Sequence, residues 1–310
     1  MLALLCSCGS RKVEIGIAWR YGDNPAYYTK IINAIREAGG TPVILGQVKP
    51  EAFEYEGTKL PDSYTDGQGV LLQPFADRVK ALPADSSNVA EAVGRVRAVV
   101  FTGGEDISPT LYRNPEPWHG LEDEGAYDAA RDVSEYLTLA YCLGEDIPTL
   151  CICRGMQMLS VVSGADMIQD IPEYIENCTG NSYGYLHRQA KFPGVKRDYA
   201  PHDVIVTDRE SVFYRICGCD TLRAVPSWHH QCVESVEGTP LKVSGVTLTQ
   251  GVEIIEAVER PDRTFCIGVQ FHPEGAIDKC LNGDPYASDY MDMDAALSYF
   301  RELVKEAKKR

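Results

Sequence analysis

The first part of the chain alternates short apolar runs with segments of helical spacing. Apolar runs at 13–18 and 41–45 predict two short strands. Between them, residues 27–38 carry apolar side chains at helical intervals and end at Gly39-Gly40, which is typical of a helix C-terminus. A strand, a helix and a strand in succession predict parallel strands joined by a right-handed crossover.

The pattern weakens in the next segment and then returns. Residues 49–94 show no clear periodicity and are rich in Gly, Pro, Asp and Ser, so we expect an insertion with one helix near 72–80. Beyond it, the pattern predicts a strand at 98–101, a long helix at 123–143 and a further strand at 148–152.

The second half is richer in short strands. The pattern predicts them at 204–206, 222–225, 243–248, 254–258 and 264–269, before a closing amphipathic helix at 295–307. We therefore expect an α/β fold, with a mostly parallel central sheet flanked by helices and an additional antiparallel β part. Because no flexible linker or internal repeat divides the chain, we expect one domain over 13–310, with the insertion at about 49–94.

Composition narrows the classes of partner. The chain has 310 residues, 44% of them hydrophobic, and a formal net charge of −15, so a nucleic-acid backbone is an unfavourable partner. No segment approaches the roughly 18 consecutive apolar residues of a membrane span. The sequence leaves a homodimer open.

The cysteines bear on location. There are eleven of them, an odd number, without a CxxC pair or paired zinc-site spacing, which favours a reducing compartment and a cytoplasmic protein. The alternative comes from residues 1–12, which begin MLALLCSC. Leu5-Cys6-Ser7-Cys8 resembles a bacterial lipobox, so a truncated leader would make the protein a membrane-anchored lipoprotein through Cys8.

Cys153 ends an apolar run and begins a helical pattern that continues through Met156, Leu159 and Val162. A strand, a sharp corner and a helix place such a side chain at the helix N-terminus, where backbone N–H groups favour a thiolate. The alternative is a buried structural cysteine that opens a core helix. Cys151, two residues earlier, is expected on the same face of an extended strand.

Two other strand ends carry candidate chemistry. His272-Pro273-Glu274 follows the predicted strand at 264–269, where a histidine could act as a base and a nearby carboxylate could orient it. Thr102-Gly103-Gly104 follows the strand at 98–101, and glycines let backbone N–H groups approach a substrate closely. Each segment taken alone also fits an ordinary turn. Asp106 is expected to cap the segment that follows it.

Three motifs occur along the chain in a particular order: Thr-Gly-Gly-Glu-Asp-Ile-Ser-Pro-Thr-Leu-Tyr at 102–112, Cys-Arg-Gly-Met-Gln at 153–157 and Val-Gln-Phe-His-Pro-Glu at 269–274. Together they resemble class I glutamine amidotransferases, and more narrowly the γ-glutamyl-γ-aminobutyrate hydrolase group of the γ-glutamyl hydrolases, peptidase C26. Arg131-Asp132 with Glu135, and Ser227-Trp228-His229-His230-Gln231, resemble further motifs of that group. The resemblance covers roughly residues 13–280 and implies a flavodoxin-like fold.

The resemblance also implies roles for residues. Cys153 would be the nucleophile, His272 the base and then the acid, and Glu274 the residue that orients it. The backbone N–H groups of Arg154 and of Gly103 or Gly104 would form the oxyanion hole. Near-site candidates, which could equally be structural, are Gln157, His229, His230 and Gln231. The implied reaction passes through a glutamyl thioester and needs no metal or organic cofactor.

Two departures from the family pattern stand out. Cys151 occupies a position where the family usually has glycine, so the strand and the helix would pack with a slight shift. The segment 49–94 is longer than expected and could cover or reshape the mouth of a pocket.

Three functions remain as alternatives. The first is a free-standing hydrolase that acts on a small γ-glutamyl compound, which the absence of a synthetase segment in this chain favours. The second is a glutaminase subunit of a two-protein amidotransferase. The third is a non-catalytic binding protein on the same fold, against which the joint presence of Cys153, His272 and Glu274 argues.

Overall fold

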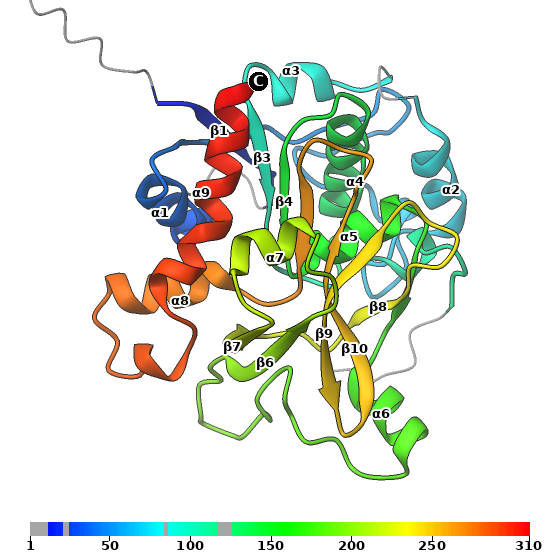
Figure 1. Cartoon of the computed structure of the whole chain (residues 1–310). Coiled ribbons are helices and arrows are strands. Elements are labelled where there is room, and N and C mark those ends of the chain that lie inside the picture. Colours follow the sequence, from blue (N-terminus) through cyan, green and yellow to red (C-terminus); the bar gives the residue numbers. More distant parts are fainter. Residues whose placement is uncertain (1–11, 21–24, 84–85, 117–125) are drawn as a thin grey trace, which may run out of the picture.

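The computed structural model describes residues 12–20, 25–83, 86–116 and 126–310 (Figure 1). Cys8 and the lipobox segment lie outside the described residues. No helix within the described ranges combines the length and the apolar character that crossing a bilayer requires.

The centre of the molecule is a nine-stranded sheet of mixed direction, in the order β2-β1-β3-β4-β11-β10-β9-β6-β7. Its parallel part comprises β1 (Glu14–Ile17), β2 (Thr41–Ile44), β3 (Ala98–Phe101), β4 (Thr149–Ile152) and β11 (Cys266–Val269). The antiparallel part comprises β10 (Val252–Glu259), β9 (Lys242–Thr249), β6 (Ala200–Val206) and β7 (Thr221–Ser227). A separate antiparallel pair consists of β5 (Asp166–Ile168) and β8 (Cys232–Ser235). The predicted α/β architecture, with a parallel core and an antiparallel part, is confirmed.

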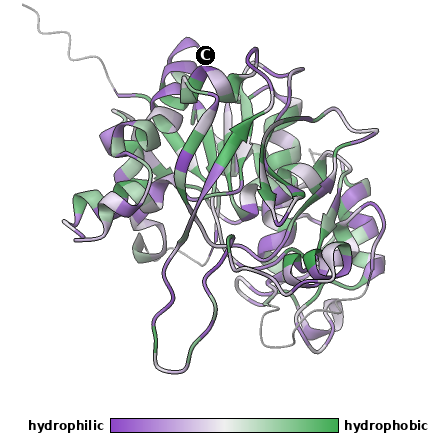
Figure 2. Ribbon diagram, turned by 60° about the horizontal axis from the view of Figure 1, so that its bottom comes forward, coloured by the Kyte–Doolittle hydropathy of each residue, from purple (hydrophilic) through white to green (hydrophobic). Residues whose placement is uncertain are grey.

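Helices cover both faces of the sheet, and each face has its own apolar core (Figure 1). One core packs against α2 (Gln73–Ala81), α3 (Val89–Val93), α4 (Ala129–Gly144) and α5 (Arg154–Val162). The other packs against α1 (Thr29–Glu37), α7 (Val212–Cys217), α8 (Pro273–Leu281) and α9 (Met293–Lys309). A smaller core lies under α6 (Ile171–Thr179). Figure 2 shows the apolar strands at the centre and polar residues toward the outside.

Most predicted elements lie where the apolar pattern indicates, and the differences have local causes. Helix α4 begins at Ala129 rather than within 123–128, because the side chain of Asp128 accepts a hydrogen bond from the backbone N–H of Arg131 and caps it. The predicted strand at 264–269 begins at Cys266 and pairs in parallel with β4, so it belongs to the parallel core. The short elements β5, β8, α3, α6, α7 and α8 are not foreseen by the pattern.

The insertion at 49–94 contains α2 and α3, and a cluster of aromatic rings holds it together. The ring of Phe53 lies 5.4 Å from that of Tyr64 and 5.9 Å from that of Phe75, and the latter two are stacked at 4.0 Å. Apolar residues of α2 and α3 join the core beside α4. The segment therefore packs on the outside of the sheet.

Candidate active site

Cys153 lies at the corner between β4 and α5, with φ +52° and ψ −109°. A non-glycine residue with positive φ is strained, and surrounding contacts must hold it there. Its backbone N–H donates to the carbonyl of Val269 at 2.7 Å, and its own carbonyl accepts from the N–H of Gln157 at 3.1 Å. Gly155 permits the tight approach, because a Cβ there would lie 2.6 Å from the carbonyl oxygen of Phe101.

The corner separates the two cysteines that the sequence places together. Cys151 is fully buried in the core beside α4 and α5, whereas Cys153 packs in the core on the opposite face of the sheet. The expectation that both thiols share one face is wrong. It assumes an extended backbone from Cys151 to Cys153, and the positive φ of Cys153 ends that extended backbone. All cysteines that the structure describes are free thiols.

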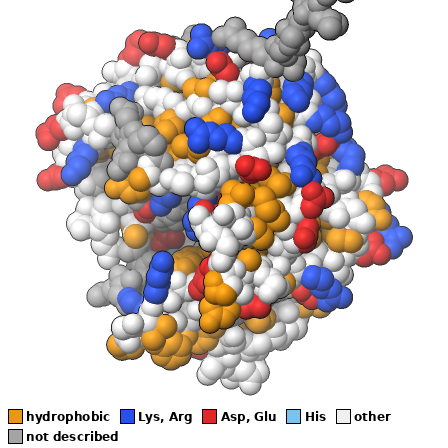
Figure 3. Space-filling view, turned by 90° about the vertical axis from the view of Figure 1, so that its left-hand side faces the viewer, with side chains coloured by type: hydrophobic (Ala, Val, Ile, Leu, Met, Phe, Trp, Pro, Cys, Tyr) orange, Lys and Arg blue, Asp and Glu red, His pale blue; other side chains and the backbone are white. Residues whose placement is uncertain are grey.

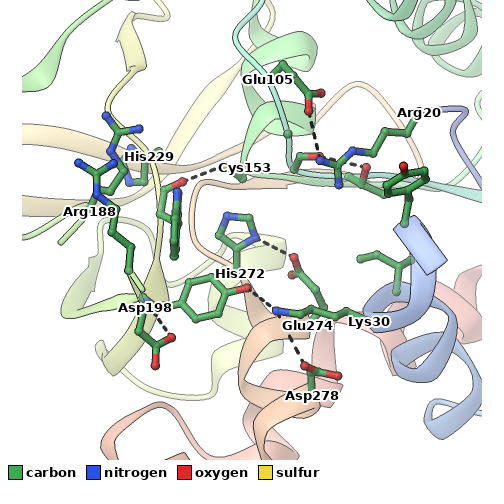
Figure 4. Close-up of a pocket in the computed structure, with 18 of the residues that line it drawn as sticks. Arg20, Lys30, Glu105, Cys153, Arg188, Asp198, His229, His272, Glu274 and Asp278 are labelled. Atoms are coloured by element: carbon green, nitrogen blue, oxygen red, sulfur yellow. Dashed lines mark hydrogen bonds and ion pairs between the residues drawn. The ribbon is translucent and has the colours of Figure 1, made fainter. Parts of the chain in front are cut away.

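His272 approaches the same point from the end of β11, immediately before α8. Its backbone N–H donates to the carbonyl of Pro226 at 2.8 Å, and its ring Nδ1 lies 2.7 Å from Oε1 of Glu274. Burial lowers the pKa of His272, but the negative charges of a Cys153 thiolate and of Glu274 outweigh it and raise that pKa to about 10. Figure 4 shows the imidazole ring between Cys153 and Glu274.

The two glycines after β3 have different neighbours. A Cβ on Gly103 would lie 2.6 Å from Cε1 of His272 and 3.5 Å from Cβ of Cys153, so this backbone borders both side chains. Gly104, with φ +154°, lies on Arg131 instead, and a Cβ there would overlap the guanidinium. The structure thus brings Gly103 to Cys153 and His272, and places Gly104 against a buried cation.

A network of buried ion pairs connects this corner to helix α4. Arg154, the first residue of α5, forms ion pairs with Asp132 and Glu135 of α4, and all three are essentially inaccessible to solvent. Arg131 pairs with Glu135 at 2.9 Å and with Glu105 at 2.6 Å. A guanidinium Nη2–H of Arg131 also donates to the carbonyl of Gly103 at 3.0 Å. Helix α4 is thereby connected to both the β3 and the β4 strand ends.

Cys153, His272 and Gly103 line a cavity of about 910 Å³. Its described lining also contains side chains of both charges: Arg20, Lys30, Arg188, Lys196, Arg197, Lys279, Glu105, Asp106, Asp198, Glu274, Asp278 and Asp284. Figure 3 views the molecule from the side of α1 and α8 and shows a hollow with basic and acidic side chains near it. None of the described residues at 49–94 lines this cavity.

The four near-site candidates also line the cavity, but they make different contacts. The Nε2–H of Gln157 donates to the carbonyl of Gln231 at 3.1 Å. His229 is held through Nδ1 by that same carbonyl at 2.9 Å, while Nε2 of His230 lies 3.1 Å from both carboxylate oxygens of Asp106. Asp106 therefore binds a histidine rather than capping a helix. Neither side-chain amide atom of Gln231 has a hydrogen-bond partner among the described residues, although both atoms are buried.

Three features of the cavity wall are not foreseen by the sequence. Sγ of Cys153 lies 3.8 Å from the carbonyl oxygen of Trp228. The ring of Tyr199 lies 5.4 Å from that of His272 and 5.9 Å from that of Trp228. Close approach of this tyrosine requires Gly275, where a Cβ would lie 2.8 Å from the ring. A lone tyrosine in a polar segment gives no periodic signal, so only the fold reveals it.

The chain is similar to known proteins over most of its length. The sequence pattern of peptidase C26 matches residues 77–274. A Mycobacterium tuberculosis protein whose name assigns it provisionally to the glutamine amidotransferases is 30% identical, over 80% of this chain and 72% of its own length. The γ-glutamyl-γ-aminobutyrate hydrolase of Escherichia coli is 27% identical, over 79% of this chain and 77% of its own length.

Solved structures agree in fold. The glutaminase domain of CTPS from Trypanosoma brucei, with bound acivicin, matches with a TM-score of 0.52 at 16% identity. The match covers 96% of this chain and 95% of that one. PurLQS from Thermotoga maritima matches with a TM-score of 0.51 at 13% identity, over 95% of this chain and 98% of the matched chain. The chain therefore belongs to the peptidase C26 family and is a glutamine amidotransferase-like hydrolase.

Proposed function

We propose that the protein is a cysteine hydrolase that cleaves the γ-glutamyl amide bond of small γ-glutamyl compounds and releases glutamate and an amine. The observation that carries the proposal is the strained corner at Cys153, which presents its thiol beside a histidine that a carboxylate holds. A nucleophile, a base and an orienting acceptor in this arrangement are what acyl transfer requires.

In the first half of the reaction, His272 takes the thiol proton and Sγ of Cys153 attacks the γ-carbonyl carbon of the substrate. A C–S bond forms and the carbonyl oxygen becomes an oxyanion. Arg154 is the first residue of α5, so its backbone N–H has no acceptor within the helix and is available to the oxyanion, together with the N–H of Gly103. The C–N bond then breaks, and His272 protonates the departing amine.

In the second half, water hydrolyses the glutamyl thioester. His272 takes a proton from the water while the water oxygen attacks the thioester carbon. The C–S bond breaks, the thiolate of Cys153 leaves, and glutamate is released. Glu274 keeps its hydrogen bond to Nδ1 throughout and stabilises the imidazolium that forms in each half.

The wall of the cavity supports a γ-glutamyl substrate. A γ-glutamyl group carries a cationic α-amine and an anionic α-carboxylate, and the described lining offers both carboxylates and cationic side chains. The buried amide of Gln231 can donate to a carboxylate and accept from an amine. The E. coli relative, named as a γ-glutamyl-γ-aminobutyrate hydrolase, agrees with this substrate class.

The test measures glutamate release from γ-glutamyl-γ-aminobutyrate, γ-glutamyl dipeptides, a polyglutamylated folate and glutamine. Cys153→Ala should abolish release, and Cys151→Ala, which removes a buried thiol two residues away, should retain it. Hydroxylamine added during turnover should intercept the thioester and yield γ-glutamyl hydroxamate with wild type and not with Cys153→Ala.

Equal release by wild type and Cys153→Ala would refute the assignment of the nucleophile. Release from glutamine alone, and only with a second protein present, would identify the glutaminase subunit of a two-protein amidotransferase instead. Release from none of these substrates would favour a non-catalytic binding protein.

A further inference from the structure

A second cluster of buried polar side chains lies next to the cavity and has no part in the proposed reaction. It consists of His187, His202 of β6, His229 of the turn between β7 and β8, and Glu256 of β10. The side chains are between 0% and 2% exposed. Figure 4 shows His229 at one wall of the cavity, whereas the other three are buried and do not belong to the described lining.

Three ring nitrogens converge on one carboxylate oxygen. Nδ1 of His187, Nε2 of His202 and Nε2 of His229 lie 3.0, 3.2 and 3.6 Å from Oε1 of Glu256. In the described part of the chain, neither these nitrogens nor either oxygen of Glu256 has a partner in hydrogen-bonding geometry. Five buried polar atoms are thus gathered around a point without being satisfied by one another, which is costly in a protein interior.

The opposite ring nitrogens are already engaged. Nδ1 of His202 lies 3.0 Å from the carbonyl oxygen of Leu186, and Nδ1 of His229 lies 2.9 Å from that of Gln231. A carbonyl accepts only, so each Nδ1 carries a proton, and in a neutral ring Nε2 then presents a lone pair. Nε2 of His187 lies 2.7 Å from the hydroxyl of Thr249. In the neutral rings of His202 and His229, lone pairs therefore face the carboxylate, and either a ring proton or a metal cation bound between them would remove the repulsion.

We propose that His187, His202 and Glu256, whose ligand atoms all lie within 4.8 Å of one another, form a binding site for a divalent transition metal, with zinc as the preferred ion. Imidazole nitrogens and a carboxylate oxygen are zinc ligands, and the backbone carbonyls that hold the outer nitrogens are the partners such ligands usually have. Zinc–ligand bonds of about 2.0–2.2 Å in a tetrahedron separate neighbouring ligand atoms by about 3.3–3.6 Å. The nitrogen–oxygen distances of 3.0 Å for His187 and 3.2 Å for His202 are slightly shorter than that separation, so a small outward shift of the side chains would admit the ion.

The site is structural in character. Three protein ligands leave one position that a water molecule would fill, but all three residues are buried and none of them lines the cavity, so a substrate in the cavity would not reach the ion. The ion would tie the segment around His187 to strands β6 and β10, and the turn at 227–231 is joined to that segment because the backbone N–H of His229 donates to the carbonyl of His187 at 3.0 Å. That turn also carries the Trp228 carbonyl beside Cys153 and the buried amide of Gln231, so the ion would hold one wall of the cavity in place.

The test uses the full-length protein, incubated with Zn²⁺, dialysed and analysed for metal content by mass spectrometry. Wild type should retain about one zinc per chain. Glu256→Gln and His202→Asn should each retain at least about tenfold less. His230→Asn is the matched control, since it alters the neighbouring buried histidine, which binds Asp106 and lies outside the cluster.

Two further measurements do not depend on the folding of the variants. Removal of metal from wild type with a chelator should lower its melting temperature, and Zn²⁺ alone should restore it. Co²⁺ in place of zinc should give the visible absorption of a tetrahedral nitrogen and oxygen site, without a sulfur-to-cobalt charge-transfer band, because no cysteine belongs to the set.

The proposal fails if wild type retains no stoichiometric metal, which would mean that protons alone hold the cluster together. It also fails if the Glu256 and His202 variants retain as much zinc as wild type, or if the cobalt spectrum shows thiolate ligands. None of these three results would bear on the glutamate-release assay, so this proposal and the proposed hydrolase activity can fail separately.

Discussion

Nδ1 of His272 lies 2.7 Å from Oε1 of Glu274, across the single proline that separates the two residues. Because Nδ1 is engaged by the carboxylate, the other ring nitrogen remains for Cys153. Both side chains are buried, so water competes little for this hydrogen bond. The pair therefore fixes the tautomer and the direction of the imidazole, and makes protonation of the ring more favourable.

Replacement of this carboxylate should slow the reaction without unfolding the protein. In Glu274→Gln the amide can present an N–H to Nδ1 and favour the wrong tautomer. We expect kcat/KM for glutamate release to fall by about 10²–10⁴, with far-UV circular dichroism unchanged. Asp294→Asn, at an exposed carboxylate of α9, is the control and should behave as wild type. Equal rates for Glu274→Gln and wild type would contradict an orienting role.

The charge of Cys153 should be visible in the titration of His272. Burial lowers the pKa of His272, and the Cys153 thiolate is the largest influence that raises it to about 10. In Cys153→Ala this pKa should fall toward the ordinary value of about 6.5. Histidine NMR signals followed across pH measure the change, with Cys151→Ala as the control that leaves the titration in place. An unchanged pKa in Cys153→Ala would show that no thiolate faces the ring.

Gly103 should be essential for activity because the site has no room for a side chain at this position. An alanine Cβ there would lie 2.6 Å from Cε1 of His272, so the imidazole must move away from Cys153. A misplacement of this kind can cost about 10²-fold in rate, and we expect such a loss in kcat/KM for Gly103→Ala. Gly46→Ala is the matched control, because no atom lies within 4 Å of the Cβ position there. Full activity of Gly103→Ala would place the ring elsewhere during turnover.

Arg154 should matter for stability through its side chain. Arg154→Met would leave the carboxylates of Asp132 and Glu135 buried with one cation fewer, at a cost of about 3–5 kcal/mol in the free energy of unfolding. Urea denaturation followed by circular dichroism measures this. Arg223→Met breaks an exposed ion pair with Asp203 and should cost at most about 1 kcal/mol. If Arg154→Met and Arg223→Met lowered the free energy of unfolding by similar amounts, the buried ion pairs of Arg154 would not be important for stability.

His230 should contribute a pH-dependent part of the stability. Burial lowers its pKa, but hydrogen bonds to Asp106 and Asp170 outweigh burial and raise it. The folded state therefore holds this proton more tightly than the unfolded state. The stabilisation is complete below the unfolded pKa of about 6.5 and is lost as pH rises through the higher folded pKa. The difference in free energy of unfolding between wild type and His230→Gln should shrink across that range, and a constant difference would contradict the prediction.

The apolar pattern was sufficient for the elements that build the parallel core. Strands β3 and β4 are fully buried and β1 nearly so, because helices cover both faces of the sheet, and such strands are continuous apolar runs; β2, at the sheet edge, is only half-buried. Short elements such as β8 lack that signal, because the two buried residues of β8 are followed by two exposed ones and form no apolar run. The apolar run at 264–269 revealed a strand, but its parallel pairing with β4 depends on contacts across more than a hundred residues.

The sequence by itself determined the chemistry of the candidate site: a cysteine, a histidine and a carboxylate after apolar strands, with glycines at a third strand end. This was possible because strand-ending motifs are local and their residue types limit the reactions available. Only the tertiary structure decided that Cys151 and Cys153 lie in opposite cores, and that His187, His202, His229 and Glu256 gather around one point. The physical reason is that a positive φ and a meeting of distant strands are products of the whole packing, and no local periodicity encodes them.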